Sequence, residues 1–166
     1  MQQILDTIAP GRKIYSHDYI TEISKTKKTL WAFKLTNKDM YEDLVSYGLH
    51  PNKSMDMQFP SIPDKYLGDF VRGYFDGDGS ICHVNSNDRW KVCFTSGSVA
   101  FLEGLRDRLH GHLGTSNFVT VQGFNMIYSK IQDVEKIGNL MYKSVPSLFL
   151  TRKQEKFMTA LQWCWE

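Results

Sequence analysis

The sequence predicts an α+β domain in which helices alternate with antiparallel β-hairpins. Segments rich in β-branched and aromatic residues come in pairs separated by short polar turns, such as "KIYSHDYITEIS" and "TLWAFKLT" around "KTKK". Between such pairs lie amphipathic segments that begin at a capping residue and end at glycine, as helices do. The 42% hydrophobic and 13% aromatic content is enough for a folded core.

The N-terminal part predicts a helix, a hairpin and a second helix. A short helix is expected over residues 1–8 and a β-hairpin over 13–35. Asn37 is positioned to cap the helix "KDMYEDLVSYGL", and Gly48 is its stop signal. The following segment, "HPNKSMDMQFPSIPDKY", has three prolines and no periodicity, which predicts an ordered connector.

The C-terminal part predicts two further hairpins among four helices. The stretch "LGDFVRGYFDGDGSI" opens as an amphipathic helix and leads into a strand pair around an Asn/Asp turn. Ser98 begins a helix that ends at Gly114, and a second hairpin follows with Gly123 near its turn. A helix capped by Asp133 and a final helix, "TRKQEKFMTALQWCW", complete the chain.

The order of elements indicates an internal repeat. The helix, hairpin and helix of the first 50 residues recur over residues 99–153, in pattern rather than in strict identity. We therefore expect a partial half-unit over residues 1–63 and a complete unit over residues 64–166.

The composition says more about the cellular environment of the protein than about its activity. The net charge of +2 neither requires nor excludes a nucleic-acid partner, because local patches matter more than the sum. No apolar run is long enough to span a bilayer, and the N-terminus does not resemble a signal peptide, so no membrane association is expected. Three cysteines without CxxC spacing indicate reduced thiols. These features predict a cytosol-like compartment.

Two acids stand where a helix should end. Asp76 and Asp78 lie near a helix C-terminus, where each carboxylate meets the negative end of the dipole at a cost of about 0.3–1 kcal/mol. Gly73 and Gly77, spaced four apart, allow a second helix to come backbone-close, which would bring two carboxylates together. Mg²⁺ would relieve their repulsion, and a phosphate can complete its shell. The alternative is that the glycines merely end the helix and form a turn.

The stretch "VRGYFDGDGSI" closely resembles the motif of the LAGLIDADG homing endonucleases. The resemblance implies an αββαββα domain with an antiparallel DNA-binding sheet, and a metal-dependent enzyme that cleaves double-stranded DNA sites and is associated with a mobile intron or intein. It also implies Mg²⁺ or Mn²⁺ as the cofactor, and a cytoplasmic or nucleoid location, or an organelle matrix if the gene is organellar. Asp78 then corresponds to the metal-binding acid, with the Gly77 carbonyl as a further ligand, whereas Asp76 supports the helix.

The resemblance further implies basic catalytic residues and a helix interface. Lys153 in "TRKQ" and Lys53 in "PNKS" match the lysines near the family's active site, where they would polarise water or stabilise charge on the phosphate; for Lys53 a solvated surface charge is equally compatible. The expected interface between motif helices consists of Gly73, Gly77, Asp76 and Phe70. Because the chain carries one motif, we expect a homodimer through this helix or a complementary partner chain, and an inactive remnant is a further alternative. Arg72 is bulky for such an interface and is expected to point away from it.

Family members lay their sheet along the major groove of DNA. In the second strand of the first pair, Arg89, Lys91 and Thr95 share one face, which suits contacts with base edges. An ordinary solvent-facing sheet surface would show the same pattern. The other predicted DNA-binding residues are His83, Thr120, Gln122, Lys130 and Arg152.

Three functions are compatible with these features. The first is the metal-dependent endonuclease. The second is a catalytically silent nucleic-acid binder, either an intron RNA maturase or a DNA-binding regulator on the same fold. The third is a structural domain whose acid pair is only a turn. An intact Asp78 favours cleavage, because a pure binder gains little from a carboxylate placed close to phosphate.

Overall fold

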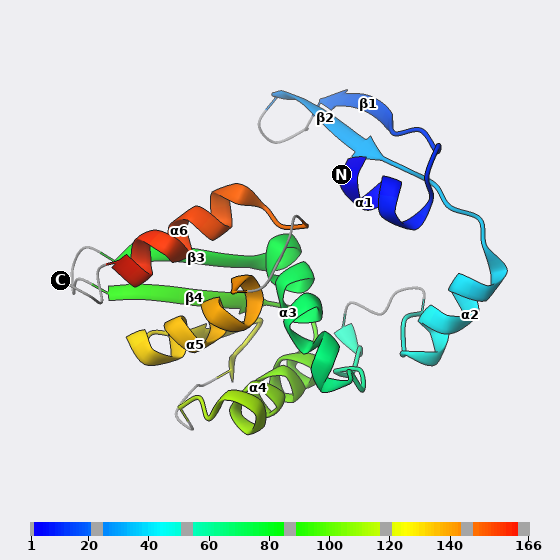
Figure 1. Ribbon diagram of the computed structural model, residues 1–166. Coiled ribbons are helices and arrows are strands. Elements are labelled where there is room, and N and C mark those ends of the chain that lie inside the picture. The colour runs from blue at the N-terminus through cyan, green and yellow to red at the C-terminus, as the bar shows by residue number, and fades with distance from the viewer. Residues whose placement is uncertain are drawn as a thin grey trace. The chain divides into compact units, whose positions relative to one another are not determined.

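The chain divides into two compact units, Met1–Glu42 and Asp43–Glu166. A computed structural model describes residues 2–20, 25–50, 55–84, 89–116, 121–143 and 148–162. The division falls inside a helix, so the expectation that residues 1–63 form a repeat half-unit stays a prediction. Figure 1 shows the elements of both units.

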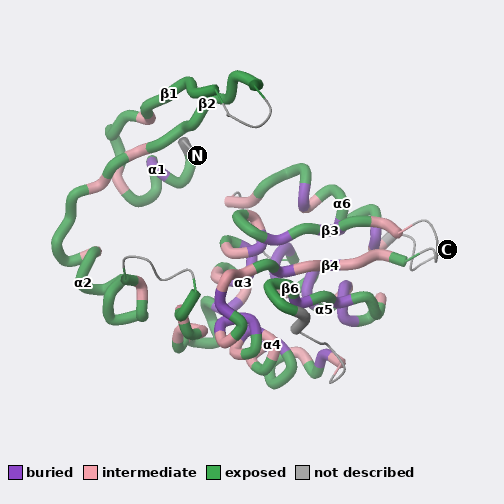
Figure 2. Tube along the Cα trace, turned by 180° about the vertical axis from the view of Figure 1, so that it is seen from behind, coloured by how far each residue is buried: buried purple, intermediate pink, exposed green. Residues whose placement is uncertain are grey.

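The first unit contains the predicted helix and hairpin. Helix α1 spans Gln2–Ile8, and strands β1 (Tyr15–Ile20) and β2 (Lys27–Ala32) pair antiparallel. All residues of both strands are exposed, and Figure 2 draws them in green. Helix α2 (Lys38–Ser46) begins as predicted, because the Asn37 side chain accepts a hydrogen bond from the Met40 amide at 2.9 Å. A Gly48 φ of +84° ends it in the left-handed region that glycine favours.

The second unit is an αββαββα domain followed by one more helix, which confirms the predicted fold class. Its elements are α3 (Asp64–Asp78), β3 (Gly79–Val84), β4 (Arg89–Thr95), α4 (Val99–Leu113), β5 (Val121–Gln122), β6 (Asn125–Tyr128), α5 (Ile131–Tyr142) and α6 (Thr151–Gln162). The strands form one antiparallel sheet in the order β3-β4-β6-β5. The hairpins therefore lie side by side through β4 and β6.

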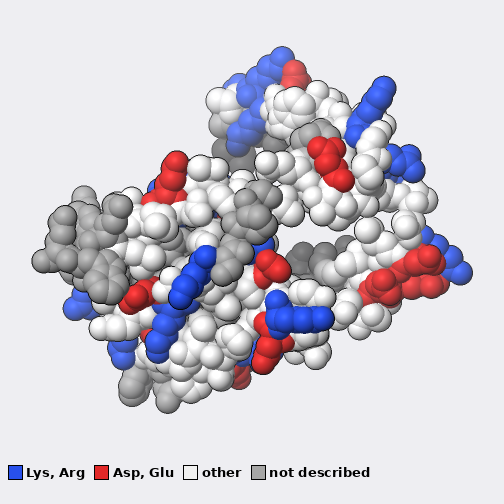
Figure 3. Space-filling view, viewed as in Figure 1, with Lys and Arg blue, Asp and Glu red and all other residues white. Residues whose placement is uncertain are grey.

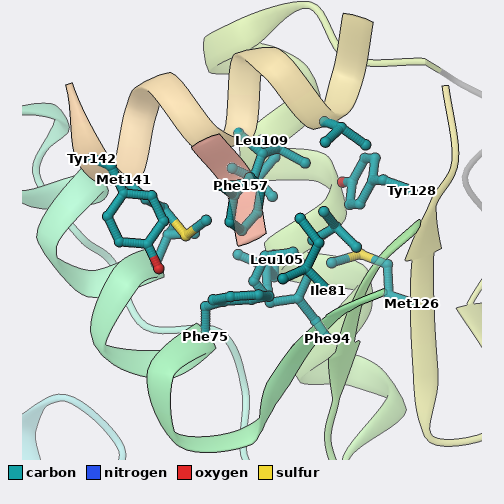
Figure 4. Close-up of a cluster of buried hydrophobic side chains, with 14 of the residues drawn as sticks. Phe75, Ile81, Phe94, Leu105, Leu109, Met126, Tyr128, Met141, Tyr142 and Phe157 are labelled. Atoms are coloured by element: carbon teal, nitrogen blue, oxygen red, sulfur yellow. The ribbon is translucent and has the colours of Figure 1, made fainter. Parts of the chain in front are cut away.

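One face of this sheet is buried against the helices. Alternate strand residues are buried: Ile81 in β3, Val92 and Phe94 in β4, and Met126 and Tyr128 in β6. They pack with apolar residues of all four helices of the domain, and Figure 4 shows how these side chains converge. The opposite face of the sheet is open, and this is the face predicted to meet DNA.

Capping residues lie at the ends of α4 as predicted, whereas the cap predicted for α5 differs. Ser98 accepts a hydrogen bond from the Phe101 amide at 3.2 Å, and Gly114 ends α4 with a φ of +58°, both as predicted. The prediction that Asp133 caps α5 is wrong, because the helix begins at Ile131 with Lys130 as its N-cap. Asp133 is instead buried and accepts from the backbone amide of Ser116 at 3.1 Å. The Asp133 carboxylate, which its local spacing predicted to cap α5, therefore binds the distant Ser116 amide instead.

Candidate DNA-cleavage site

The motif forms helix α3, which ends directly at a strand. Asp64 stands in the first turn, where a negative charge suits the helix dipole. The helix ends at Asp78, and the extended residue Gly79 closes it by donating its amide to the Phe75 carbonyl. A Cβ on Gly79 would collide with the Phe75 ring, so only glycine fits between this helix and β3. The last turn of α3, from Phe75 to Gly79, is called the α3 foot below.

Lys153 supplies the positive charge that the α3 foot requires. Its side chain is buried, and Nζ donates to the carbonyls of Phe75 at 2.5 Å, Asp76 at 2.9 Å and Gly79 at 2.6 Å. A lysine ammonium has three donors, so these carbonyls use all of them. A cation at a helix C-terminus is stabilising, which offsets the unfavourable placement of the two acids. Burial and the neighbouring Arg152 lower the pKa of Lys153, whereas Asp76 and Asp78 act in the opposite direction.

The two acids of the motif face different surroundings. The Asp76 carboxylate accepts the backbone amide of Leu150 at 2.8 Å and the hydroxyl of Tyr142 at 3.4 Å, so it points into the domain. Asp78 is exposed and borders a pocket of about 590 Å³. The other residues lining this pocket are Met57, Tyr74, Gly77, Gly79, Thr95, Ser96 and Gly97. Asp78 is therefore the acid that solvent and a ligand can reach.

Tyr74 joins the α3 foot to the end of β4. Its hydroxyl donates to the Thr95 carbonyl at 2.5 Å, and its ring lies 4.7 Å from that of Phe101. Burial raises the pKa of Tyr74, its hydrogen bond with Ser96 opposes this shift, and the nearby Asp78 charge adds to it. The neutral phenol is thus favoured near Asp78, and its hydrogen bond links α3 to the end of β4.

Arg72 points away from the glycine face of α3, as expected. The guanidinium is buried and donates to the carbonyls of Leu148 at 2.9 Å and Met141 at 3.0 Å, and it pairs with Asp69 at 2.6 Å. It therefore holds the end of α5 and the residues that shortly precede α6. Sequence reasoning did not identify these contacts, although an arginine on the apolar side of an amphipathic helix is a signal for a buried partner.

The glycines of α3 have different neighbours. A Cβ on Gly68 would lie 2.5 Å from the Leu140 carbonyl oxygen, so this glycine permits the close approach of α3 and α5. A Cβ on Gly73 or Gly77 would meet nothing within 4 Å among the described residues. Phe70, also predicted at a helix interface, packs against Phe59 at 5.5 Å and borders a groove of about 550 Å³ with Gly73 and Asp78.

We expect substitutions at Gly68 and Gly73 to change the stability of the protein in opposite directions. Gly68→Ala should lower the free energy of unfolding by about 1–3 kcal/mol, because the new methyl group must displace a backbone carbonyl. Gly73→Ala should raise it by about 0.5–1 kcal/mol, because alanine is a better helix former in open space. Urea unfolding of both variants measures the two changes. A Gly73→Ala variant less stable than the wild type as a monomer would contradict the open position of this residue.

The open face of the sheet carries the predicted polar row. The residues Arg89, Lys91 and Thr95 alternate with the half-buried Trp90 and the buried Val92 and Phe94, so they lie on the side away from the helices. Thr95 is paired with Asn125 of β6, and its hydroxyl donates to the Asn125 side-chain oxygen at 2.9 Å. Cys93 donates to the same oxygen at 3.5 Å. Asn125 was missed from the sequence because only the register of β4 and β6 brings it beside Thr95.

The other predicted DNA-binding residues do not form one group with this row. His83 lies on the helix-covered face, opposite to Arg89 and Lys91, and its ring is 5.2 Å from that of Trp90. That placement argues against a base contact shared with the row. Lys130 is the N-cap of α5 and donates to Ser116 at 2.9 Å, and Arg152 is exposed at the start of α6. Lys53, Thr120 and the Gln122 side chain lie outside the described residues.

Charge is not gathered into one patch on the face drawn in Figure 3. Described lysine and arginine side chains are interspersed there with aspartate and glutamate. Within the described ranges no three His, Cys, Asp or Glu side chains gather as a metal cluster. In the same ranges no helix combines the length and apolar character that crossing a membrane requires.

Helix α3, the two hairpins and the acids of the α3 foot belong to one αββαββα arrangement. Residues 65–138 match the family model of the LAGLIDADG-like domain. That family comprises homing endonucleases and maturases. A comparison with curated proteins returned no match. The matched segment contains α3 except for its first residue, both hairpins and the acid pair, and Lys153 lies beyond it.

Proposed function

We propose that this protein is a site-specific, metal-dependent endonuclease acting on double-stranded DNA, associated with a mobile intron or intein. One observation carries the proposal: the α3 foot exposes a single motif acid, Asp78, at a pocket, while Asp76 and Lys153 are engaged inside the domain. An exposed carboxylate that borders a pocket has a use in metal-dependent cleavage and little use in nucleic-acid binding alone.

Mg²⁺ or Mn²⁺ fits the donors that the α3 foot offers. Mg²⁺ is commonly held by one or two carboxylates together with waters and substrate phosphate oxygens, rather than by a cage of protein ligands. Asp78 and the carbonyl of Gly77 would be this chain's share of such a site. The bound ion would supply charge stabilisation and an activated water for hydrolysis of the phosphodiester.

A second α3 helix would complete the site. Each interior glycine costs about 1 kcal/mol relative to alanine, and the cost of Gly73 and Gly77 is not offset by any close approach among the described residues. A partner helix packed on this face would use the space and bring a second acid beside Asp78. We therefore propose a homodimer through α3, with a complementary partner chain as the alternative.

Gly73→Leu should prevent self-association of the protein. The side chain would occupy the surface on which the partner backbone is proposed to lie, so the mass in solution should fall from dimer to monomer. Light scattering after size-exclusion chromatography measures this mass. Gly111→Leu is the matched control, since Gly111 of α4 is also exposed with nothing within 4 Å. A Gly73→Leu protein that remains dimeric would show that the contact lies elsewhere.

The chain's own residues have separate tasks in this proposal. The row of Arg89, Lys91 and Thr95, joined by Asn125, faces the major groove and selects the sequence. Tyr74 ties the end of this row to the α3 foot, so the selected base pairs and Asp78 keep a fixed relation. Asp78 then lies where a scissile phosphate can reach it.

Cleavage of a library of duplexes with randomised sites tests the proposed activity. We expect Mg²⁺-dependent cutting of a minority of sequences, with no cutting in EDTA. Binding to duplex or structured RNA without cleavage under any divalent cation would favour the alternative function, a silent maturase or regulator. The alternative is supported by the single motif of the chain.

A further inference from the structure

Helices α3 and α6 cap each other. Asp76 of α3 accepts the amide of Leu150, the residue that immediately precedes α6, and its charge suits the N-terminal end of that helix. Lys153 of α6 in return donates to the last carbonyls of α3. The two contacts run in opposite directions between the same two helix ends, so neither end can move without losing both.

The carbonyls that Lys153 binds belong to residues other than the two exposed residues of the α3 foot. They belong to Phe75, Asp76 and Gly79, on the inner side of the foot, whereas Gly77 and Asp78 are exposed. The ammonium also lies 4.9 Å from the centre of the Phe75 ring, which closes the site toward the core. Lys153 thus occupies the inner half of the foot and leaves the outer half, with Gly77 and Asp78, to a ligand.

We propose that Lys153 is a positioning residue, which fixes the end of α3 so that Asp78 and the Gly77 carbonyl present a preformed half-site for a divalent cation. This inference rests on the proposed metal-dependent function. It also replaces the role expected from the sequence, in which Lys153 polarises water or stabilises charge on the phosphate. With its three donors occupied and its side chain buried, Lys153 does not touch the substrate.

The α6 end of this junction is itself anchored. Arg72, one turn before Asp76 on α3, donates to the carbonyls of Leu148 and Met141, and Tyr142 donates to Asp76. Phe157, one turn beyond Lys153, packs its ring 5.4 Å from that of Phe75. The packed core therefore fixes the position of Lys153, and Lys153 in turn fixes the end of α3. A flexible surface lysine could not fix it in this way.

Lys153→Met tests the inference on the full-length protein. Without the ammonium, three carbonyls lose their partner, so amide hydrogen exchange over residues 77–81 should quicken at least about tenfold as the foot opens locally. Lys156→Met is the matched control, because Lys156 lies on the same helix and is exposed. The control should exchange at the wild-type rate.

Cation binding provides the second readout, with Tb³⁺ as the probe. Lys153→Arg keeps the positive charge, but its planar fork cannot direct donors at three converging carbonyls, so Tb³⁺ affinity should fall about 10–100-fold. Lys153→Met removes a charge that repels the cation, and under the proposal lost geometry outweighs this relief. Cleavage by either variant should recover as the Mg²⁺ concentration is raised, whereas loss of a catalytic group would lower the maximal rate at every concentration.

Wild-type exchange together with wild-type or tighter Tb³⁺ binding in Lys153→Arg would overturn the inference, even if Lys153→Met fails to fold. The failure of the proposed function looks different. In that case the wild-type protein itself neither binds Tb³⁺ at Asp78 nor cuts DNA, while the exchange experiment still decides whether Lys153 holds the α3 foot.

Discussion

Asp78→Asn should abolish metal-dependent DNA cleavage and leave DNA binding largely intact. Asparagine keeps the size of the side chain but loses the charge that attracts a divalent cation, and loss of one charge-stabilising group in a catalytic site typically costs 10²–10³-fold in rate. We therefore expect cleavage of a selected duplex to fall by at least about 100-fold. Single-turnover cleavage measures the rate, and gel retardation in Ca²⁺ measures the binding.

The matched control for this substitution is Asp64→Asn. Asp64 lies at the other end of the same helix and pairs with Arg108 on the surface, away from the pocket that Asp78 borders. Its replacement should leave the cleavage rate unchanged. An Asp78→Asn protein that cuts at the wild-type rate would contradict the assignment of Asp78 as the metal-binding acid.

Phe75→Ala should destabilise the second unit by about 3–5 kcal/mol, as large-to-small substitutions of buried phenylalanine do. The ring is fully buried, and it lies between Phe94 of the sheet at 5.5 Å and Phe157 of α6 at 5.4 Å (Figure 4). Its loss leaves a cavity directly beneath the α3 foot. Denaturant unfolding followed by circular dichroism measures the change.

Tyr66→Ala is the control for the loss of an aromatic ring from the same helix. Tyr66 is 52% exposed, and its ring contacts Lys65 at the surface. We expect its replacement to change stability by no more than about 0.5 kcal/mol, as is usual for surface positions. Similar destabilisation by both substitutions would mean that Phe75 is not part of the core.

Much of the fold could be predicted from the sequence because its signals are local. The caps at Asn37 and Ser98 and the left-handed glycines at positions 48, 114 and 123 act within a few residues of the turn they set. The alternation in β4 predicted which face carries Arg89 and Lys91. The prediction that Asp133 caps a helix failed because local spacing does not reveal its long-range contact with the Ser116 amide.

The candidate site was predictable only in its residue types. The motif identified Asp76 and Asp78, yet nothing in their spacing separates an inward acid from an exposed one. The groups that make this distinction are the Tyr142 hydroxyl, the Leu150 backbone amide and the Lys153 ammonium, which lie 66 to 77 positions from Asp76 along the chain. Asn125 on the sheet face lies 30 positions from its partner Thr95, and Arg72 of α3 lies 69 positions from Met141 at the end of α5.

The sequence by itself determined that this chain has an αββαββα domain with an acid pair at the end of its motif helix, because helix periodicity, glycine and capping residues act over short distances. Only the tertiary structure decided which acid is exposed and what Lys153 does. A buried ammonium must find as many acceptors as it has donors, and in this fold the only acceptors that surround it among the described residues are the carbonyls of the α3 foot.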